Sequence, residues 1–138
     1  MIVNSWEFKY KIYHVSMKIL ILGSNGFFGR AIKKRLKLNK KNKILFLTKS
    51  KNFDFTDLNK LEKFYLKNKP EIIINCAGYG GSIHYFAKKP ADTLDSVRMY
   101  INIYKASEKL KKKPKIVNCL ANCVYTANQN FQIEKKWD

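Results

Sequence analysis

The sequence is poor in cysteine, histidine, proline and acidic residues, and each shortage argues against a class of protein. Its 138 residues include three cysteines, two histidines and three prolines. Cys76, Cys119 and Cys123 follow neither a metal-ligand spacing nor a disulfide framework, so no metal site is predicted and a reducing cytoplasm is expected. No segment approaches the ~20 apolar residues of a membrane span, and the amino terminus lacks the pattern of a secretory signal, so no membrane partner is expected.

The scarcity of acidic residues gives a formal net charge of +18, which would ordinarily indicate a nucleic-acid or membrane partner. Only Arg30, Arg35 and Arg98 among the 28 basic residues are arginines, whereas sequence-specific readers of nucleic acid depend on arginine. The lysines are spread along the chain, and the run at 111–113 is expected to be a solvated helix end. We therefore predict no specific nucleic-acid partner, and a basic nucleic-acid-binding protein remains the third hypothesis.

Only six glycines are present, yet Gly23, Gly26 and Gly29 follow an apolar run of strand length at 18–22. Each glycine meets a separate need: a tight turn at Gly23, backbone approach to a pyrophosphate at Gly26, and close helix-on-strand packing at Gly29. A helix starting near Phe27 would direct unpaired N–H groups and its dipole at an anion. The motif predicts a dinucleotide-binding turn, and the alternative is a turn that only connects a strand to a helix. Its candidate cofactor-binding residues are Gly23, Ser24, Asn25, Gly26, Phe27, Phe28 and Gly29.

Strand and helix patterns alternate from residue 17 onward. Strands are expected at 18–22, 43–47, 52–55, 71–76 and 115–120, and helices at 27–38, between Thr56 and Pro70, and at 91–112. The Thr56 hydroxyl is expected to cap the second helix. Alternation implies right-handed parallel crossovers, so the predicted fold is an α/β, Rossmann-type doubly wound parallel sheet, order 3-2-1-4-5, truncated. The ligand crevice should lie at the carboxyl ends of the first and fourth strands.

Residues 1–16 are treated as an amino-terminal extension, and residues 17–138 as an incomplete NAD(P)-binding Rossmann domain. We expect the extension to be unstructured, because strands before the phosphate turn are unusual in this architecture. Apolar and polar residues alternate at 6–12, which leaves an edge strand as the alternative.

Four segments together resemble the extended short-chain dehydrogenase/reductase family, which includes the NAD-dependent nucleotide-sugar epimerases, dehydratases and reductases. They are Gly-Ser-Asn-Gly-Phe-Phe-Gly at 23–29, Asp-Phe-Thr-Asp at 54–57, Asn-Cys-Ala-Gly at 75–78 and Asn-Cys-Val-Tyr at 122–125. Segments 80–92 and 123–125 are also similar to those of the GDP-fucose synthases. The resemblance covers about residues 17–138, the amino-terminal part of such an enzyme. It implies the cofactor-binding portion of an enzyme that transfers hydride to or from a carbon of a nucleotide sugar.

The resemblance also assigns cofactor roles. It implies that Asp54 with Phe55 borders the adenine and that Ala77 with Gly78, following Cys76, lines the nicotinamide side. These positions end or follow strands at the expected crevice, although Asp54 also suits a turn or cap.

Cofactor choice depends on the end of the second strand, where an acidic residue would accept the ribose hydroxyls of NAD. This chain has Thr-Lys-Ser-Lys at 48–51, and Lys49 and Lys51 suit a 2′-phosphate. We therefore prefer NADP over NAD, although two lysines can fall there by chance in so lysine-rich a chain.

The catalytic pattern of the family is incomplete here. The resemblance implies a Ser or Thr hydroxyl at the position of Ala121, and a Tyr-x-x-x-Lys pair that would lie past Asp138. Asn122 offers a hydrogen bond to substrate but not the same relay. Cys123 aligns with a cysteine that acts as an acid or base in fucose synthases, and plain packing is the alternative.

Two expectations follow from the missing catalytic groups. Ala121 leaves open a second hypothesis, a catalytically inactive dinucleotide-binding or sensing module. A truncated sheet should also leave apolar surface uncovered, so we expect a tendency to aggregate or to form a homodimer.

Overall fold

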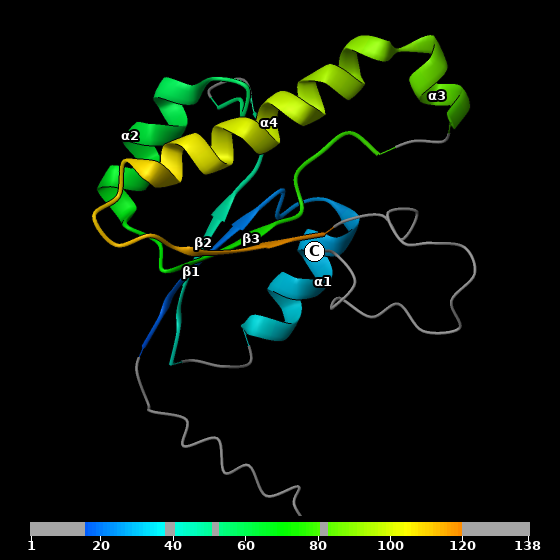
Figure 1. Cartoon of the computed structure of the whole chain (residues 1–138). Coiled ribbons are helices and arrows are strands. Elements are labelled where there is room, and N and C mark those ends of the chain that lie inside the picture. Colours follow the sequence, from blue (N-terminus) through cyan, green and yellow to red (C-terminus); the bar gives the residue numbers. More distant parts are fainter. Residues whose placement is uncertain (1–15, 38–40, 51–52, 81–82, 120–138) are drawn as a thin grey trace, which may run out of the picture.

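A four-stranded parallel sheet with helices on both faces forms the body of the molecule (Figure 1). The computed structural model describes residues 16–37, 41–50, 53–80 and 83–119. Its strands are β1 (Lys18–Leu22), β2 (Lys43–Leu47), β3 (Ile72–Asn75) and β4 (Lys115–Asn118). Its helices are α1 (Phe27–Leu36), α2 (Leu58–Asn68), α3 (Ile83–Lys88) and α4 (Pro90–Glu108). The strand order is β2-β1-β3-β4, which confirms the Rossmann-type sheet.

The central strand β1 pairs in parallel with β2 and with β3, and its side chains alternate between the two faces of the sheet. Leu20 and Leu22 belong to the buried cluster under α2 and α4. Ile19 and Ile21 point to the other face and are also buried. The strand is therefore apolar throughout because both of its faces are covered.

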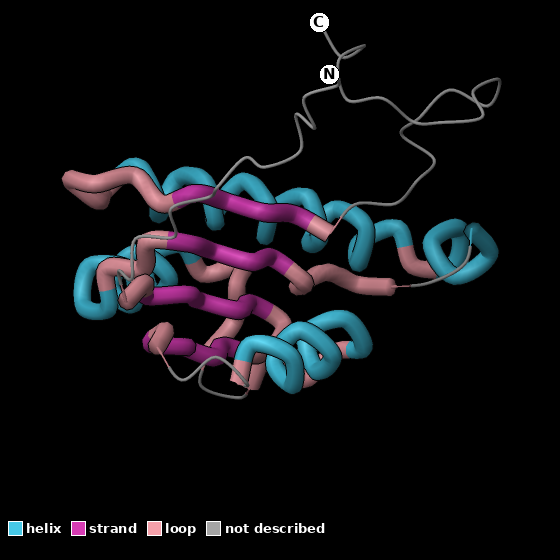
Figure 2. The backbone as a smooth tube through the Cα atoms, turned by 90° about the horizontal axis from the view of Figure 1, so that it is seen from below, coloured by secondary structure: helices cyan, strands magenta, loops and turns pink. Residues whose placement is uncertain are grey.

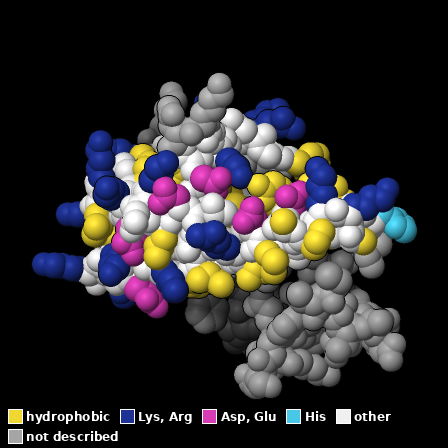
Figure 3. Space-filling model, turned by 90° about the horizontal axis from the view of Figure 1, so that it is seen from above, with side chains coloured by type: hydrophobic (Ala, Val, Ile, Leu, Met, Phe, Trp, Pro, Cys, Tyr) yellow, Lys and Arg dark blue, Asp and Glu magenta, His cyan; other side chains and the backbone are white. Residues whose placement is uncertain are grey.

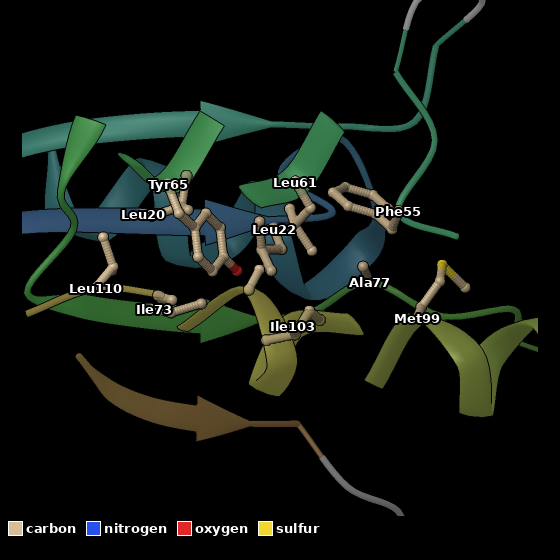
Figure 4. Packing of buried hydrophobic residues seen from close by; sticks show 11 residues of the cluster. Leu20, Leu22, Phe55, Leu61, Tyr65, Ile73, Ala77, Met99, Ile103 and Leu110 are labelled. Carbon is tan, nitrogen blue, oxygen red and sulfur yellow. The ribbon is translucent and has the colours of Figure 1, made fainter. Parts of the chain in front are cut away.

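The layer of α2 and α4 closes one face of the sheet (Figure 4). Leu61 and Tyr65 of α2, together with Ile103 of α4, are fully buried against the sheet. Asn102 of α4 donates hydrogen bonds to the carbonyl oxygens of Phe55 (3.1 Å) and Thr56 (2.9 Å). This amide fixes the loop before α2 against α4.

The opposite face carries α1, which lies in front of the sheet in Figure 2. Gly29 is the one buried residue of α1, whereas Ile32 and Leu36 are half-buried. Phe28 is 61% exposed. Within the described residues, α1 is the only helix on this face, and β3 and β4 stand clear of it (Figure 2).

The strand predicted at 52–55 was wrong for residues 53–55, which the structure describes. Phe53 forms an isolated antiparallel bridge with Ser50 instead. The carboxylate of Asp54 accepts hydrogen bonds from the backbone N–H and the hydroxyl of Thr56, both at 2.9 Å. This local turn bends the chain away from the sheet, so the predicted order 3-2-1-4-5 is present as its 2-1-4-5 part.

Helix starts differ from the predictions in two places. Asp57, not Thr56, caps α2, because its carboxylate accepts from the backbone N–H of Lys60 at 3.1 Å. The long helix covers Pro90–Glu108 instead of 91–112, so the lysines at 111–113 follow the helix, and a short helix, α3, precedes it and was missed. Tyr85 of α3 donates a hydrogen bond to the carboxylate of Asp92, which ties α3 to the start of α4.

The outer surface of the α2 and α4 layer mixes charge types (Figure 3). Lysine and arginine side chains lie there among acidic and apolar ones. The apolar members include Leu66, Leu94, Val97 and Ile101. None of the described helices is long and apolar enough to span a bilayer.

Candidate functional site

The glycine turn after β1 brings the start of α1 against the end of the sheet. Gly23 has φ +70°, and a Cβ there would lie 2.6 Å from the carbonyl oxygen of Cys76. A Cβ at Gly29 would lie 2.2 Å from the carbonyl oxygen of Gly23. A side chain at either position would force the backbone apart, which confirms the tight turn and the close helix packing predicted for them.

Gly26 is the N-cap of α1. Its backbone is extended, and as a glycine it has no side chain that could cap the helix. The first turn of the helix contains no acidic residue. The positive end of the helix dipole is therefore not offset by a carboxylate of its own first turn, which favours an external anion. Phe27 and Phe28 follow in edge-to-face contact, with ring centroids 5.3 Å apart, and Phe27 is 78% exposed.

An amide network holds the end of β3 beside this turn. The side-chain oxygen of Asn75, which is fully buried, accepts from the backbone N–H of Ala77 at 3.0 Å. The amide nitrogen of Asn75 donates to the side chain of Asn118 on β4 at 3.1 Å, and Asn118 in turn donates to Tyr104 at 2.8 Å. These bonds position the backbone of Cys76 and Ala77 against Gly23.

A lysine links the end of β2 to the segment after β3. The ammonium of Lys49 donates to the hydroxyl of Tyr79 at 2.7 Å and lies 2.9 Å from the carboxylate of Asp54. The bonds to Tyr79 and to Asp54 raise the pKa of Lys49. Burial alone would raise the pKa of Asp54, but hydrogen bonds from Thr56 and Lys49 outweigh it, so the pKa is lowered. Lysine and aspartate thus remain charged at neutral pH.

These elements enclose two adjoining cavities at the carboxyl ends of β1 and β3, where the topology predicted a crevice. The first, of about 190 Å³, is lined by the glycine turn, the end of β2, Phe55, residues 76–79 and Met99. The second, of about 800 Å³, shares residues 76–79 and extends to Phe28, Tyr100 and Cys119. The crevice can therefore hold an extended ligand whose middle lies near the glycine turn.

A third cavity, of about 640 Å³, lies at the other end of the sheet. Lys18 and Glu71, which begin the central strands or precede them, contribute to its lining. It contains no part of the glycine turn. We assign the candidate site to the crevice because ligands of open α/β sheets bind outside the carboxyl ends of the strands.

The structure brings most of the predicted site residues together. Those that line the two cavities are Gly23, Gly26, Phe28, Lys49, Phe55, Cys76, Ala77 and Gly78. Ser24 is buried within the turn, Asn25 is exposed on it, and Asp54 contributes through Lys49. Lys51, Asn122 and Cys123 lie outside the described residues.

Three residues that line the smaller cavity were missed by the analysis of the sequence. Thr48 and Tyr79 each follow the end of a strand, so the predicted topology was a sufficient signal for both. Met99 reaches the cavity from the middle of α4, and nothing in its local sequence marks it. Among the described residues, no cluster of three or more His, Cys, Asp or Glu side chains could hold a metal ion.

Comparisons with known proteins agree with this geometry. GDP-L-colitose synthase of Yersinia pseudotuberculosis is 33% identical over 120 residues, which are 79% of this chain and 35% of that protein. A solved GDP-L-fucose synthetase from Naegleria fowleri bound to NADP has a TM-score of 0.66 and 28% identity, over 86% of this chain and 36% of that one. A solved dTDP-4-dehydrorhamnose reductase from Clostridium acetobutylicum has a TM-score of 0.69 and 26% identity, over 85% and 40%.

The chain spans 35–37% of the length of the curated relatives it matches. The sequence model of the NAD dependent epimerase/dehydratase family matches residues 19–137, which include every element of the crevice described above. The chain therefore belongs to the NAD dependent epimerase/dehydratase family.

Proposed function

We propose that this chain is the dinucleotide-binding portion of a nucleotide-sugar epimerase, dehydratase or reductase, and that it binds NADP(H) in preference to NAD(H). The observation that carries the proposal is the glycine turn. A Cβ at Gly23 would overlap the carbonyl oxygen of Cys76 at the end of β3, and a Cβ at Gly29 of α1 would overlap the carbonyl oxygen of Gly23. Such closeness leaves the uncapped start of α1 accessible to a pyrophosphate.

The proposal gives each wall of the crevice a role. The backbone around Gly26 would hold the pyrophosphate, Phe55 and Asp54 would border the adenine, and Ala77 with Gly78 would line the nicotinamide side. The bound dinucleotide would supply hydride transfer to or from a sugar carbon. The protein's own contribution is to orient the two halves and to exclude water from the narrower cavity.

The preference for NADP depends on Lys49. Its ammonium lies at the carboxyl end of β2, which no Asp or Glu follows before Asp54. Its raised pKa keeps the group cationic at neutral pH, and a phosphate can share or replace the carboxylate of Asp54 as its partner. The NADP-bound Naegleria fowleri structure supports the same choice.

Titration of the purified chain with NADPH, followed by nicotinamide fluorescence and thermal stabilisation, tests the proposed binding. The expected result is saturable binding that Gly26→Ala weakens at least about tenfold, because the added methyl group occupies the approach to the pyrophosphate. A Cβ at Gly26 lies no closer than 3.2 Å to Gly23, so the variant should fold. Lys67→Ala, at an exposed position in the last turn of α2 that lines neither cavity, should leave binding unchanged. Equal binding by both variants, or no binding by the folded parent chain, contradicts the proposal.

The cofactor preference has its own matched pair of variants. Lys49→Gln should lower the affinity for NADPH about tenfold and leave that for NADH nearly unchanged, since only NADPH carries the 2′-phosphate. Lys43→Gln removes the same charge from the opposite end of β2 and should change neither affinity. If Lys49→Gln weakens both cofactors equally, NADP preference is not its role.

A second candidate function is a dinucleotide-binding module without catalysis. Ala121, at the position where the family resemblance implies a hydroxyl, is the observation that favours it. It predicts NADPH affinity without turnover of nucleotide sugars by the longest reading frame that contains this chain. Turnover in that protein, or its gain on Ala121→Ser, would exclude the inactive module.

A further inference from the structure

Two cysteines face each other at the carboxyl ends of β3 and β4. Cys76 and Cys119 follow the last paired residues of these strands, Asn75 and Asn118. Their sulfur atoms are 3.5 Å apart, although the residues are 43 positions apart in the sequence. The N–H of Cys119 donates to the carbonyl oxygen of Asn75 at 3.0 Å, and that of Cys76 donates to Leu22 at 3.0 Å. Backbone hydrogen bonds therefore hold both cysteines in place.

This arrangement places the two cysteines within reach of a disulfide. Neighbouring strands lie about 4.8 Å apart, within the range of about 4.4–6.8 Å that disulfide-bonded Cα atoms occupy. The two side chains already point toward each other, since their sulfur atoms are in contact. Only a small rotation of the side chains is needed to bring the sulfurs to bonding distance.

Small oxidants can reach the pair. Both cysteines are free and partly exposed, and both line the cavity of about 800 Å³. Burial and the contact with Cys119 raise the pKa of Cys76 to about 12, so this sulfur is a neutral thiol at pH 7. Both cysteines are reduced in this structure, and because only a thiolate attacks a peroxide, the oxidation should be slow at neutral pH and faster at alkaline pH.

We propose that Cys76 and Cys119 form a reversible intrachain disulfide when the chain meets a hydroperoxide, and that this bond fastens β4 to β3. One sulfur attacks the peroxide oxygen, which gives a sulfenic acid and water. The second sulfur then displaces the hydroxyl group, the S–S bond forms and a second water leaves. With hydrogen peroxide, two thiols and one peroxide give one disulfide and two waters, and a dithiol reverses the reaction.

The consequence of this bond follows from the place of β4. β4 is the edge strand of the described sheet and pairs only with β3 there. A covalent link between two residues 43 positions apart reduces the freedom of the unfolded chain as well as fastening the edge. It also ties β4 to Cys76, whose carbonyl oxygen packs against Gly23. The oxidised chain should therefore unfold at a higher temperature than the reduced chain.

The test uses the full chain carrying Cys123→Ser, because Cys119 and Cys123 fall in one tryptic peptide, 116–135. The reduced variant is treated with hydrogen peroxide, blocked with N-ethylmaleimide and measured by intact mass and by peptide mapping. We expect a loss of two hydrogen atoms, a link between peptides 68–88 and 116–135, and full reversal by a dithiol. Oxidation should raise the unfolding temperature by at least about 5 °C.

Two double variants provide the controls. Cys76→Ser/Cys123→Ser and Cys119→Ser/Cys123→Ser each keep one thiol of the pair and should show neither the mass loss nor the temperature rise. Disulfide-linked dimers or sulfinic acids in place of the internal link overturn the proposal. An internal link without a rise in unfolding temperature overturns the fastening of β4.

Discussion

The two faces of the sheet are built differently. Under α2 and α4, side chains such as Leu20, Leu61 and Ile73 are completely buried. On the face that carries α1, Ile74 is only half-buried and Val117 is 43% exposed. Because burial of apolar area provides most of the stabilisation, the first face holds the fold together. The second face carries the glycine turn, so this part of the candidate site lies apart from the stabilising cluster, whereas Phe55, Ala77 and Met99 line the crevice and also belong to that cluster.

Glycine explains why α1 contributes so little burial. α1 approaches the sheet through backbone atoms at Gly29, whereas α2 and α4 approach through large side chains. In the proposed function, this close approach leaves the amino end of α1 open for a pyrophosphate, and the helix makes fewer apolar contacts as a result.

Truncation of adjacent isoleucines in β3 should show the largest difference between the faces. Ile73→Ala is expected to lower the free energy of unfolding by about 3.5 kcal/mol, because it leaves a cavity in the buried cluster. Ile74→Ala points to the α1 face and should cost about 1.5 kcal/mol, since that side chain is half-buried. Urea denaturation of both variants measures this, and equal losses would mean that the faces do not differ.

A methyl group at Gly29 should weaken the α1 face selectively. Gly29→Ala is expected to lower the free energy of unfolding by about 2 kcal/mol, because α1 must move away from the carbonyl oxygen of Gly23. Hydrogen exchange should accelerate in α1 and remain slow in α2 and α4. Gly80→Ala, which meets open space, is the control and should change neither quantity. Equal acceleration in all three helices would show that the layers open together.

Among the described residues, the face under α2 and α4 contains an unfavourable group, the hydroxyl of Tyr65. Removal of this hydroxyl should stabilise the fold. Tyr65 is fully buried, and no described residue offers its hydroxyl a hydrogen bond. Burial raises the pKa of this phenol. Tyr65→Phe should therefore raise the free energy of unfolding by about 1 kcal/mol, measured in urea. Tyr104→Phe removes a hydroxyl that accepts from Asn118 and should destabilise the chain slightly, by about 0.5 kcal/mol.

The glycine turn and the sheet could be predicted because their signals are local. An apolar run followed by glycines at 23, 26 and 29 specifies strand, turn and helix within about a dozen residues. The carboxyl ends of β1 and β3 then follow from the parallel topology, which correctly located Lys49 and Ala77 in the crevice, whereas Phe55 was placed there by the family resemblance.

The parts that could not be predicted depend on contacts between distant residues or on competing side chains. The apolar pattern at 53–55 suits a strand, but the carboxylate of Asp54 bonds the chain two residues ahead and turns it. Met99 enters the crevice, and Cys76 meets Cys119, only once α4 and β4 are in place. The sequence spacing of these residues carries no information about such contacts.

The smallest expected change in the free energy of unfolding concerns the ion pair of Asp54 and Lys49, which lies beside the crevice. The folded pKa of Asp54 is lowered from 3.8, so its contribution to stability is present above that pH and disappears as pH falls through the folded value. The pKa of Lys49 is raised from 10.5, so the pair should persist through neutral and mildly alkaline pH. Asp54→Asn is expected to lower the free energy of unfolding by about 0.5 kcal/mol at pH 6, because both side chains are substantially exposed.

Urea denaturation of the Asp54→Asn variant and its parent, repeated as the pH is lowered, measures this contribution. The difference between them should shrink to nothing well below pH 3.8, where the parent carboxylate is protonated as well. When Lys49→Met is also present, Asp54→Asn should lower the free energy of unfolding by less at pH 6. The loss that remains is due to the hydrogen bonds that Asp54 accepts from Thr56. If Asp54→Asn costs as much as Ile73→Ala, this exposed ion pair stabilises the fold as strongly as the buried cluster does, and the contrast between the two fails.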